Sequence, residues 1–290
     1  MRFPRFIRFF RHLNWATLKL AFQRAGEQRL PGLAAEMAYN AMLSLFPTIL
    51  AILTAIGLFA SLRFTVRDIA YQVSQVAPSE ALFLIQGFVQ TVSRSHNEGL
   101  FSLSFIVALW TASGAQSAAM AALDEIHQIP LQQRRPFWKA KLVSIGLTIG
   151  TILLLIVAAF LMFISDLIVQ AVASKSGNLQ SELLKLWRLL TWPAGLAIIA
   201  SAFAFIYRYG PSRWKKGSPI LPGAILAAIS WAILSSLFRL YVTNFGNYNA
   251  AYGAVGTFIV LMLWLNLSSL VMLFGGQLNV TVGESMRKKG

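Results

Sequence analysis

The sequence predicts an all-α, polytopic membrane protein with six transmembrane helices. Of its 290 residues, 57% are hydrophobic and only 12% are charged, whereas about one quarter of a typical soluble domain is charged. Apolar runs recur along the chain, each near or above the ~20 residues that cross a bilayer. Basic residues gather in alternate connections between these runs, as expected for the loops on one side of a membrane.

We place the six spans at about residues 33–62, 100–122, 142–169, 188–208, 219–242 and 253–281, each from its apolar length. No Pro-, Gly- or Ser-rich linker divides the chain, so residues 1–290 are predicted to form a single integral membrane domain. The chain has no cysteine, which excludes disulfides, thiol catalysis and cysteine-ligated metals.

Most of the 25 Lys and Arg residues lie in segments 1–32, 123–141, 208–218 and the C-terminal tail. Six spans place both termini on one side of the membrane, and these four segments fall on that side. The positive-inside rule therefore predicts that both termini are cytoplasmic. Membrane topology accounts for most of the net charge of +15, so this charge does not indicate nucleic-acid binding.

At the start of the basic segment 1–32, between residues 2 and 11, an arginine stands at every third position among phenylalanines. These arginines interrupt any apolar core of a signal peptide. Two interpretations remain open, an amphipathic helix on the surface of anionic lipid and a solvated flank. The candidates for contact with anionic lipid in this segment and in the cytoplasmic loops are Arg2, Arg5, Arg8, Arg11, Arg134, Arg135, Arg213, Lys215 and Lys216.

The longest connection, residues 63–98, carries two apolar patterns at helical spacing on either side of Pro78. This spacing predicts two amphipathic helices on the outer face. They either cap a cavity or rest on the lipid surface, and the sequence does not decide between the two.

The first span carries polar residues on one face of an otherwise apolar helix. At 100° per residue, Glu36, Asn40, Ser44 and Pro47 fall within an arc of about 80°. Pro47 also removes one backbone donor and clashes near the Leu43 carbonyl. Because lipid cannot satisfy polar groups, we expect this face to point into the bundle or a cavity, where such residues often mark a pathway. An interfacial position of Glu36 is the alternative.

The second and sixth spans also carry polar residues on one face. On the second span, four such residues share an arc of about 60°: Trp110, Ser113, Ser117 and Asp124. On the sixth span, three such residues lie within about 80°: Asn266, Ser269 and Gln277. Such residues either line a polar pathway or bond neighbouring helices together. Asp124 lies at the depth of Glu36 and has three candidate partners, namely Glu36, Arg134 and Arg135.

Four blocks of sequence resemble the YihY/BrkB family of bacterial inner-membrane proteins. They are AEMAYNAMLSLFP at 35–47, the tryptophan and small residues at 110–119, YRYGPSRW at 207–214, and YNAAYGAVGTFIVLMLWLNLSSLVMLFGGQLN at 248–279. The resemblance covers nearly the whole chain, and its first and last blocks are the specific ones. It implies a six-helix bundle in the bacterial cytoplasmic membrane. Gln277 departs from the family pattern, which has Glu in the final G-x-E-L block, so an essential acid at that position is in doubt.

Labels of this family include "ribonuclease BN" and "virulence factor", and the sequence speaks against the first. Metal-dependent RNA hydrolysis needs several His and carboxylate ligands around one or two ions, but the three histidines, His12, His96 and His127, are scattered. We expect no enzyme, cofactor, metal or catalytic residue, and no nucleic-acid partner. The expected partners are membrane lipids, chiefly anionic ones, and a homo-oligomer is compatible with the sequence.

Two functions remain. The first is a transporter or flippase-like protein for a lipid or an envelope precursor, with the polar faces of the first, second and sixth spans along its path. The second is a non-transporting scaffold for envelope assembly. The family resemblance favours the transporter, because members of the family are tied to the integrity of the cell envelope.

Overall fold

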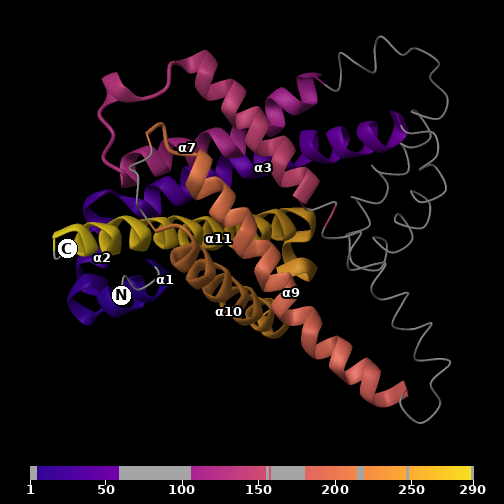
Figure 1. Cartoon of the computed structure of the whole chain (residues 1–290). Helices are drawn as coiled ribbons and strands as arrows, with labels where there is room; N and C mark the ends of the chain where they lie inside the picture. The colour runs from indigo at the N-terminus through magenta and orange to yellow at the C-terminus, as the bar shows by residue number, and fades with distance from the viewer. Residues whose placement is uncertain are drawn as a thin grey trace. The chain divides into compact units, whose positions relative to one another are not determined.

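The computed structural model describes residues 5–58, 106–154, 157, 180–213, 219–245 and 248–288. All regular structure in these ranges is helical, which confirms the all-α prediction for them. The elements, drawn in Figure 1, are α1 (Arg5–His12), α2 (Trp15–Glu27), α3 (Leu30–Leu58), α7 (Gly114–Ile126), the 3-10 turn η2 (Leu131–Gln133), α9 (Gln180–Tyr209), α10 (Leu221–Phe245) and α11 (Tyr248–Lys288). A further helix occupies Phe137–Leu154.

The chain divides into two compact units. The first contains Met1–Met42 and Ala115–Gly290, and the second contains Leu43–Gly114. One boundary falls inside α3, and the other falls at the start of α7, where a turn at Ser113 interrupts the helix. The prediction of a single domain stays a prediction.

The N-terminal helices follow each other with short, well-capped breaks. The side chain of Asn14 accepts hydrogen bonds from the backbone N–H and the hydroxyl of Thr17, at 2.9 and 2.8 Å, so it satisfies an otherwise unpaired donor at the start of α2. Arg29 then adopts a left-handed conformation, with φ of 55°, and the chain turns directly into α3. A left-handed residue commonly ends a helix. Phe9 of α1 is fully buried, and α1 contacts α10 and α11.

Helices α9, α10 and α11 pack closely because glycines let their backbones approach. A methyl group on Gly275 of α11 would lie 2.6 Å from the Ala227 methyl of α10 and 2.6 Å from the Tyr207 hydroxyl of α9. At the start of α10, the side chain of Asn279 accepts from the Gly223 N–H at 2.9 Å and donates to the Ile220 carbonyl at 3.0 Å. The first turn of α10 is therefore bonded to α11.

The apolar core of the first unit joins residues from six helices. Leu30 of α3, Leu123 of α7 and Leu273 of α11 are fully buried in it. Ala25 of α2 and Tyr207 of α9 belong to the same cluster. Small residues of α7 and α10 fill the positions between these larger side chains, as expected for membrane helices in close contact.

Among the described residues, four helices are long and apolar enough to cross a membrane: Ile106–Ile126, Phe137–Leu154, Leu221–Val242 and Phe258–Arg287. They overlap the second, third, fifth and sixth predicted spans. The first predicted span overlaps α3, and the fourth overlaps the shorter apolar helix Pro193–Tyr209. The count of six spans stays a prediction.

Two predicted features differ from the structure or fall outside it. The connection between the fifth and sixth predicted spans, residues 243–252, is helical where the structure describes it, since α10 extends to Phe245 and α11 begins at Tyr248. The pair of outer helices predicted within 63–98 lies outside the described residues. The membrane-surface role of segment 1–32 stays a prediction.

Substitution of Gly275 tests the close packing of α9, α10 and α11. Gly275→Ala places a methyl group against Ala227 and Tyr207, so the helices must separate, and overpacking of this kind costs about 1–3 kcal/mol. We expect a lower midpoint of thermal unfolding in detergent. Gly146→Ala is the matched control, because a methyl group there meets no atom within 4 Å, and helix propensity alone favours alanine. Equal midpoints for the two variants would contradict the close approach.

Candidate functional site

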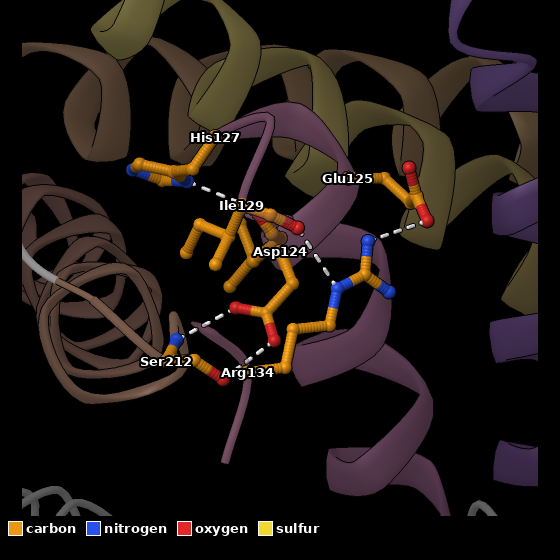
Figure 2. A network of polar contacts seen from close by, with 7 residues as sticks. Asp124, Glu125, His127, Ile129, Arg134 and Ser212 are labelled. Atoms are coloured by element: carbon orange, nitrogen blue, oxygen red, sulfur yellow. Dashed lines mark hydrogen bonds and ion pairs between the residues drawn. The ribbon is translucent and has the colours of Figure 1, made fainter. Parts of the chain in front are cut away.

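A cluster of polar contacts joins the end of α7 to the end of α9. Asp124, in the last turns of α7, is only 5% exposed. One carboxylate oxygen accepts a hydrogen bond from the Ser212 backbone N–H and the other from the Ser212 hydroxyl, both at 2.6 Å. Figure 2 shows the carboxylate pointing at Ser212, which lies just beyond α9. Both oxygens of this buried acid are thus used within the protein.

The end of α7 explains why Asp124 is held there. Gln128 is left-handed, with φ of 51°, and the Ile129 N–H bonds back to the Asp124 carbonyl at 3.0 Å. His127 bonds through Nδ1 to the Leu123 carbonyl at 2.8 Å. These contacts satisfy carbonyls that a helix end leaves unpaired, so the backbone at Asp124 is fixed.

Arg135 completes the cluster from the connection that follows. Its guanidinium donates to the carbonyls of Gly210 at 2.6 Å, Tyr209 at 3.1 Å and Pro211 at 2.8 Å. Its backbone N–H donates to the Ser212 hydroxyl at 3.1 Å. A cation at this position also complements the negative end of the α9 dipole. We call Asp124, Arg135 and Ser212 the α9 clasp.

The charge of Arg135 is subject to two opposed effects. Burial lowers the pKa of the guanidinium, and the nearby Asp124 carboxylate raises it. Arginine nevertheless keeps its proton in proteins, because its ordinary pKa lies far above neutral pH. The clasp therefore holds a permanent positive charge over the end of α9.

A second pair lies beside the clasp. Arg134 donates to the Glu125 carboxylate at 2.7 Å and to the Ile129 carbonyl at 3.1 Å, as Figure 2 shows. Of the three partners considered for Asp124, the structure places Arg135 next to it and pairs Arg134 with Glu125 instead. Because Glu125 is half-exposed, this pair contributes at most about 1 kcal/mol.

The predicted polar residues of the first unit occupy different environments. Glu36 is exposed, and Asn40 is half-buried and donates to the Glu36 carbonyl of its own helix at 2.9 Å. Ser117 and Asn266 are half-buried, whereas Ser269 is buried. Their convergence on a shared interior stays a prediction.

Gln277 is the most deeply buried of these predicted residues, with no exposed surface. Its amide N–H donates to the Thr281 hydroxyl at 3.1 Å. Its carbonyl oxygen has no hydrogen-bond partner among the described residues. A buried, unpaired acceptor costs about 1–3 kcal/mol, so this oxygen needs an explanation other than stability.

In the second unit, the first and second predicted spans, which carry several of the predicted polar residues, are in contact. Ser44 of α3 is 4% exposed, and its hydroxyl lies 3.3 Å from the Thr111 carbonyl of the second span. Ser113 is fully buried and donates to the Trp110 carbonyl at 2.7 Å. Trp110 is 41% exposed. Pro47 lies inside α3, which continues as a helix on both sides of it.

The predicted lipid-contact residues also divide. Arg134 and Arg135 contact other parts of the chain, as described above, while Arg11 and Arg213 are exposed and Arg8 is half-buried. The side chains of Arg2, Arg5, Lys215 and Lys216 lie outside the described residues. Binding of lipid by any of these residues stays a prediction.

Sequence reasoning missed Ser212, Tyr207 and Asn279. The Tyr207 hydroxyl is buried and donates to the Met272 carbonyl, and Asn279 bonds the first turn of α10. A signal for Ser212 exists in the sequence, since the buried acid Asp124 needs donors and the Gly-Pro-Ser turn after α9 offers them. Where the structure is described, no group of three or more His, Cys, Asp or Glu residues is arranged to hold a metal ion.

Comparison with known proteins shows which family the chain resembles. A family model described as "Virulence factor BrkB" matches residues 21–290. The chain is 33% identical over 272 residues to a protein of Bacillus subtilis named "Putative ribonuclease-like protein YfkH", covering 94% of this chain and 96% of that one. It is 29% identical over 275 residues to a UPF0761 membrane protein of Alteromonas mediterranea, covering 92% and 87% of the two chains.

A UPF0761 membrane protein of Tolumonas auensis is 26% identical to the chain and covers 97% of it, with 93% of its own length matched. No solved structure matches. The family match spans all of the helices from α3 onwards, including the α9 clasp and the buried polar face of α11. Together with the apolar helices, these similarities show that the chain is a membrane protein and belongs to the BrkB virulence factor family.

Proposed function

We propose that the chain is a transporter or flippase-like protein for a lipid or an envelope precursor in the bacterial cytoplasmic membrane. The observation that carries this proposal is Gln277, whose carbonyl oxygen is buried in α11 without a partner among the described residues. Buried polar groups are almost always hydrogen-bonded, and exceptions commonly have a functional reason. A polar head group or water that passes α11 would bond this oxygen transiently.

The polar character of α11 supports the same proposal. Ser269, Asn279 and Thr281 are buried with Gln277 on this helix. Lipid cannot form hydrogen bonds with such side chains, so they are not expected on a helix that faces only lipid. Asn279 has a structural partner in α10, whereas the carbonyl oxygen of Gln277 has no partner among the described residues. The face that contains Gln277 is therefore the best candidate for a polar path.

Pro47 provides a second line of support. Proline inside a helix leaves the carbonyl four residues earlier unpaired and permits bending. That residue is Leu43, where the boundary between the two compact units lies. The other boundary coincides with the interruption at Ser113 and Gly114. At both places where the chain passes between the units, the hydrogen bonding of a helix is interrupted. Such interruptions permit the bending that a transport gate requires.

We also propose that the chain is not an enzyme. The name of the Bacillus subtilis relative contains "ribonuclease-like", but the chemistry of this chain does not favour metal-dependent cleavage of RNA. His12 and His127 each bond through Nδ1 to a carbonyl of their own helix, which is a helix-capping role. The sequence contains one other histidine, His96.

The alternative function is a non-transporting scaffold for envelope assembly. The α9 clasp is compatible with it, because three buried or half-buried polar residues bind the ends of α7 and α9 into one rigid joint. Rigid joints serve scaffolds and transporters alike, so the two functions must be separated by measuring flux.

The positive-inside distribution of Lys and Arg supports a topology with both termini in the cytoplasm. Because the native chain has no cysteine, single cysteines can report the side of each segment. We expect a cysteine at Ser95 to react with a membrane-impermeant thiol reagent in intact cells and a cysteine at Ser285 to react only after the cells are opened. The reverse pattern would overturn the topology.

Flux through proteoliposomes tests the transport proposal. Purified protein is reconstituted into vesicles of phosphatidylethanolamine and phosphatidylglycerol with a head-group-labelled phosphatidylglycerol, and movement of the label between leaflets is followed by chemical quenching from outside. We expect faster movement than in protein-free vesicles. Gln277→Leu should slow it about tenfold, since one lost hydrogen bond of about 1.4 kcal/mol gives this factor, and should leave the unfolding midpoint unchanged or higher.

Thr281→Ser is the matched control, because it keeps the hydroxyl that Gln277 contacts, and it should retain flux. Movement of the label no faster than in protein-free vesicles would contradict transport of this lipid class and favour the scaffold. Full flux in a stable Gln277→Leu protein would remove Gln277 from the path.

A further inference from the structure

An open groove of about 330 Å³ runs between α9 and α10. It is lined mainly by apolar atoms, from Leu196 and Ile199 of α9 and from Trp231 and Ala232 of α10, with Ser235 and Arg239 also contributing from α10. Sites that bind small molecules usually measure about 300–1,000 Å³ and are largely apolar with few polar groups. The groove has the size and the lining of such a site.

The groove extends along α10 from near the end of its candidate span to near the middle of the span. The candidate span runs from Leu221 to Val242, so Arg239 lies near its end and Trp231 lies near its middle. These two residues are eight positions apart, which is about 12 Å along a helix. The positive charge is therefore at the level of lipid head groups, and the apolar part of the groove descends from it toward the membrane centre.

The surroundings of the groove are suited to lipid. Ile233, Leu237 and Leu240 on α10 are each more than half exposed, as expected for side chains that face acyl chains. Trp231 is held in place by a hydrogen bond from its indole N–H to the Ser268 hydroxyl at 3.0 Å and by an edge contact with Trp264. The floor of the groove is therefore fixed before any ligand binds.

The charge at the end of the groove selects the ligand. Arginine near the end of a span extends to the interface and attracts anionic lipid, and its planar fork matches the oxygens of a phosphate. The apolar groove and the cation together match a lipid acyl chain and an anionic head group.

We propose that this groove binds one acyl chain of an anionic phospholipid, such as phosphatidylglycerol, whose phosphate contacts Arg239. The chain lies against Ile199 and Ala232 and ends near Trp231. This binding site does not depend on the transport proposed above, because a bound lipid serves a scaffold equally well.

Quenching of Trp231 fluorescence tests the proposal. The protein is reconstituted into vesicles that contain either phosphatidylglycerol or phosphatidylcholine with bromine atoms at mid-chain, which quench nearby tryptophans. The contribution of Trp231 is the difference between the wild-type protein and Trp231→Phe. One cation near the surface favours anionic lipid by ~1 kcal/mol. We therefore expect half-maximal quenching of Trp231 at a roughly fivefold lower mole fraction of brominated phosphatidylglycerol than of brominated phosphatidylcholine.

Two variants separate the head group from the acyl chain. Arg239→Gln should abolish the preference and leave quenching by both lipids at the level of phosphatidylcholine. Ala232→Phe fills the groove and should reduce quenching by both. The matched controls are Arg208→Gln, which removes an exposed cation of α9, and Ile233→Phe, which adds bulk to α10 outside the groove. Both controls should behave as wild type.

Equal quenching by the two lipids in the wild-type protein would overturn the proposal, as would a preference that survives Arg239→Gln. Normal quenching in Ala232→Phe would show that the acyl chain does not occupy the groove. Since the readout is lipid contact at equilibrium, its result stands whether or not the protein moves lipid in the flux assay.

Discussion

The contact between Asp124 and Ser212 is the interaction on which the first unit most depends. It lies where two helices end, and helix ends carry unpaired backbone groups that must find partners away from water. Asp124 and Arg135 supply those partners for the end of α9. Because α9 is fixed there, Leu123 lies against Gly210 and Gly276, and Tyr207 lies against Gly275. Close packing of α11 follows from this arrangement.

The coarse architecture could be predicted from the sequence because membrane helices obey a simple requirement for apolar length. The fifth span was predicted at 219–242 and is found in α10 from Leu221. Helix ends were harder to predict. Hydropathy ended the sixth span at 281, but α11 continues to Lys288, because its last turns are stabilised by contacts such as the ion pair between Arg24 and Glu284 at 2.8 Å. Hydropathy does not record such pairing.

The candidate site could be predicted only in part. Asp124 was singled out from its place on a polar face, and Arg135 was among its candidate partners. The role of Arg135 was nevertheless also predicted as lipid contact, because the positive-inside pattern counts charges without showing what they bind. Ser212 was missed since a serine in a basic loop carries no periodic signal. The convergence of Glu36, Asp124, Asn266 and Gln277 depends on helix rotation, which one sequence does not specify.

The buried polar groups of the first unit differ in whether they have partners. Asp124, Arg135 and Asn279 have partners and stabilise the fold. The amide N–H of Gln277 donates to Thr281, but its carbonyl oxygen has no partner among the described residues and does not stabilise the fold. On the outer surface of α9 and α10, Arg239 stands beside an apolar groove. The proposed lipid transport would use all three features, namely a rigid frame, a polar interior group and a surface that binds lipid.

Hydrogen exchange at Ser212 tests the role of the clasp most directly. The backbone N–H of Ser212 donates to the Asp124 carboxylate, and a hydrogen bond to a charged group contributes about 1.5–3 kcal/mol. We expect the Ser212 amide to exchange at least about tenfold faster in Asp124→Ala than in the wild-type protein. The same amide should keep its protection in Glu125→Ala, which removes the neighbouring exposed carboxylate. An exchange rate unchanged by Asp124→Ala would contradict the central role of this contact.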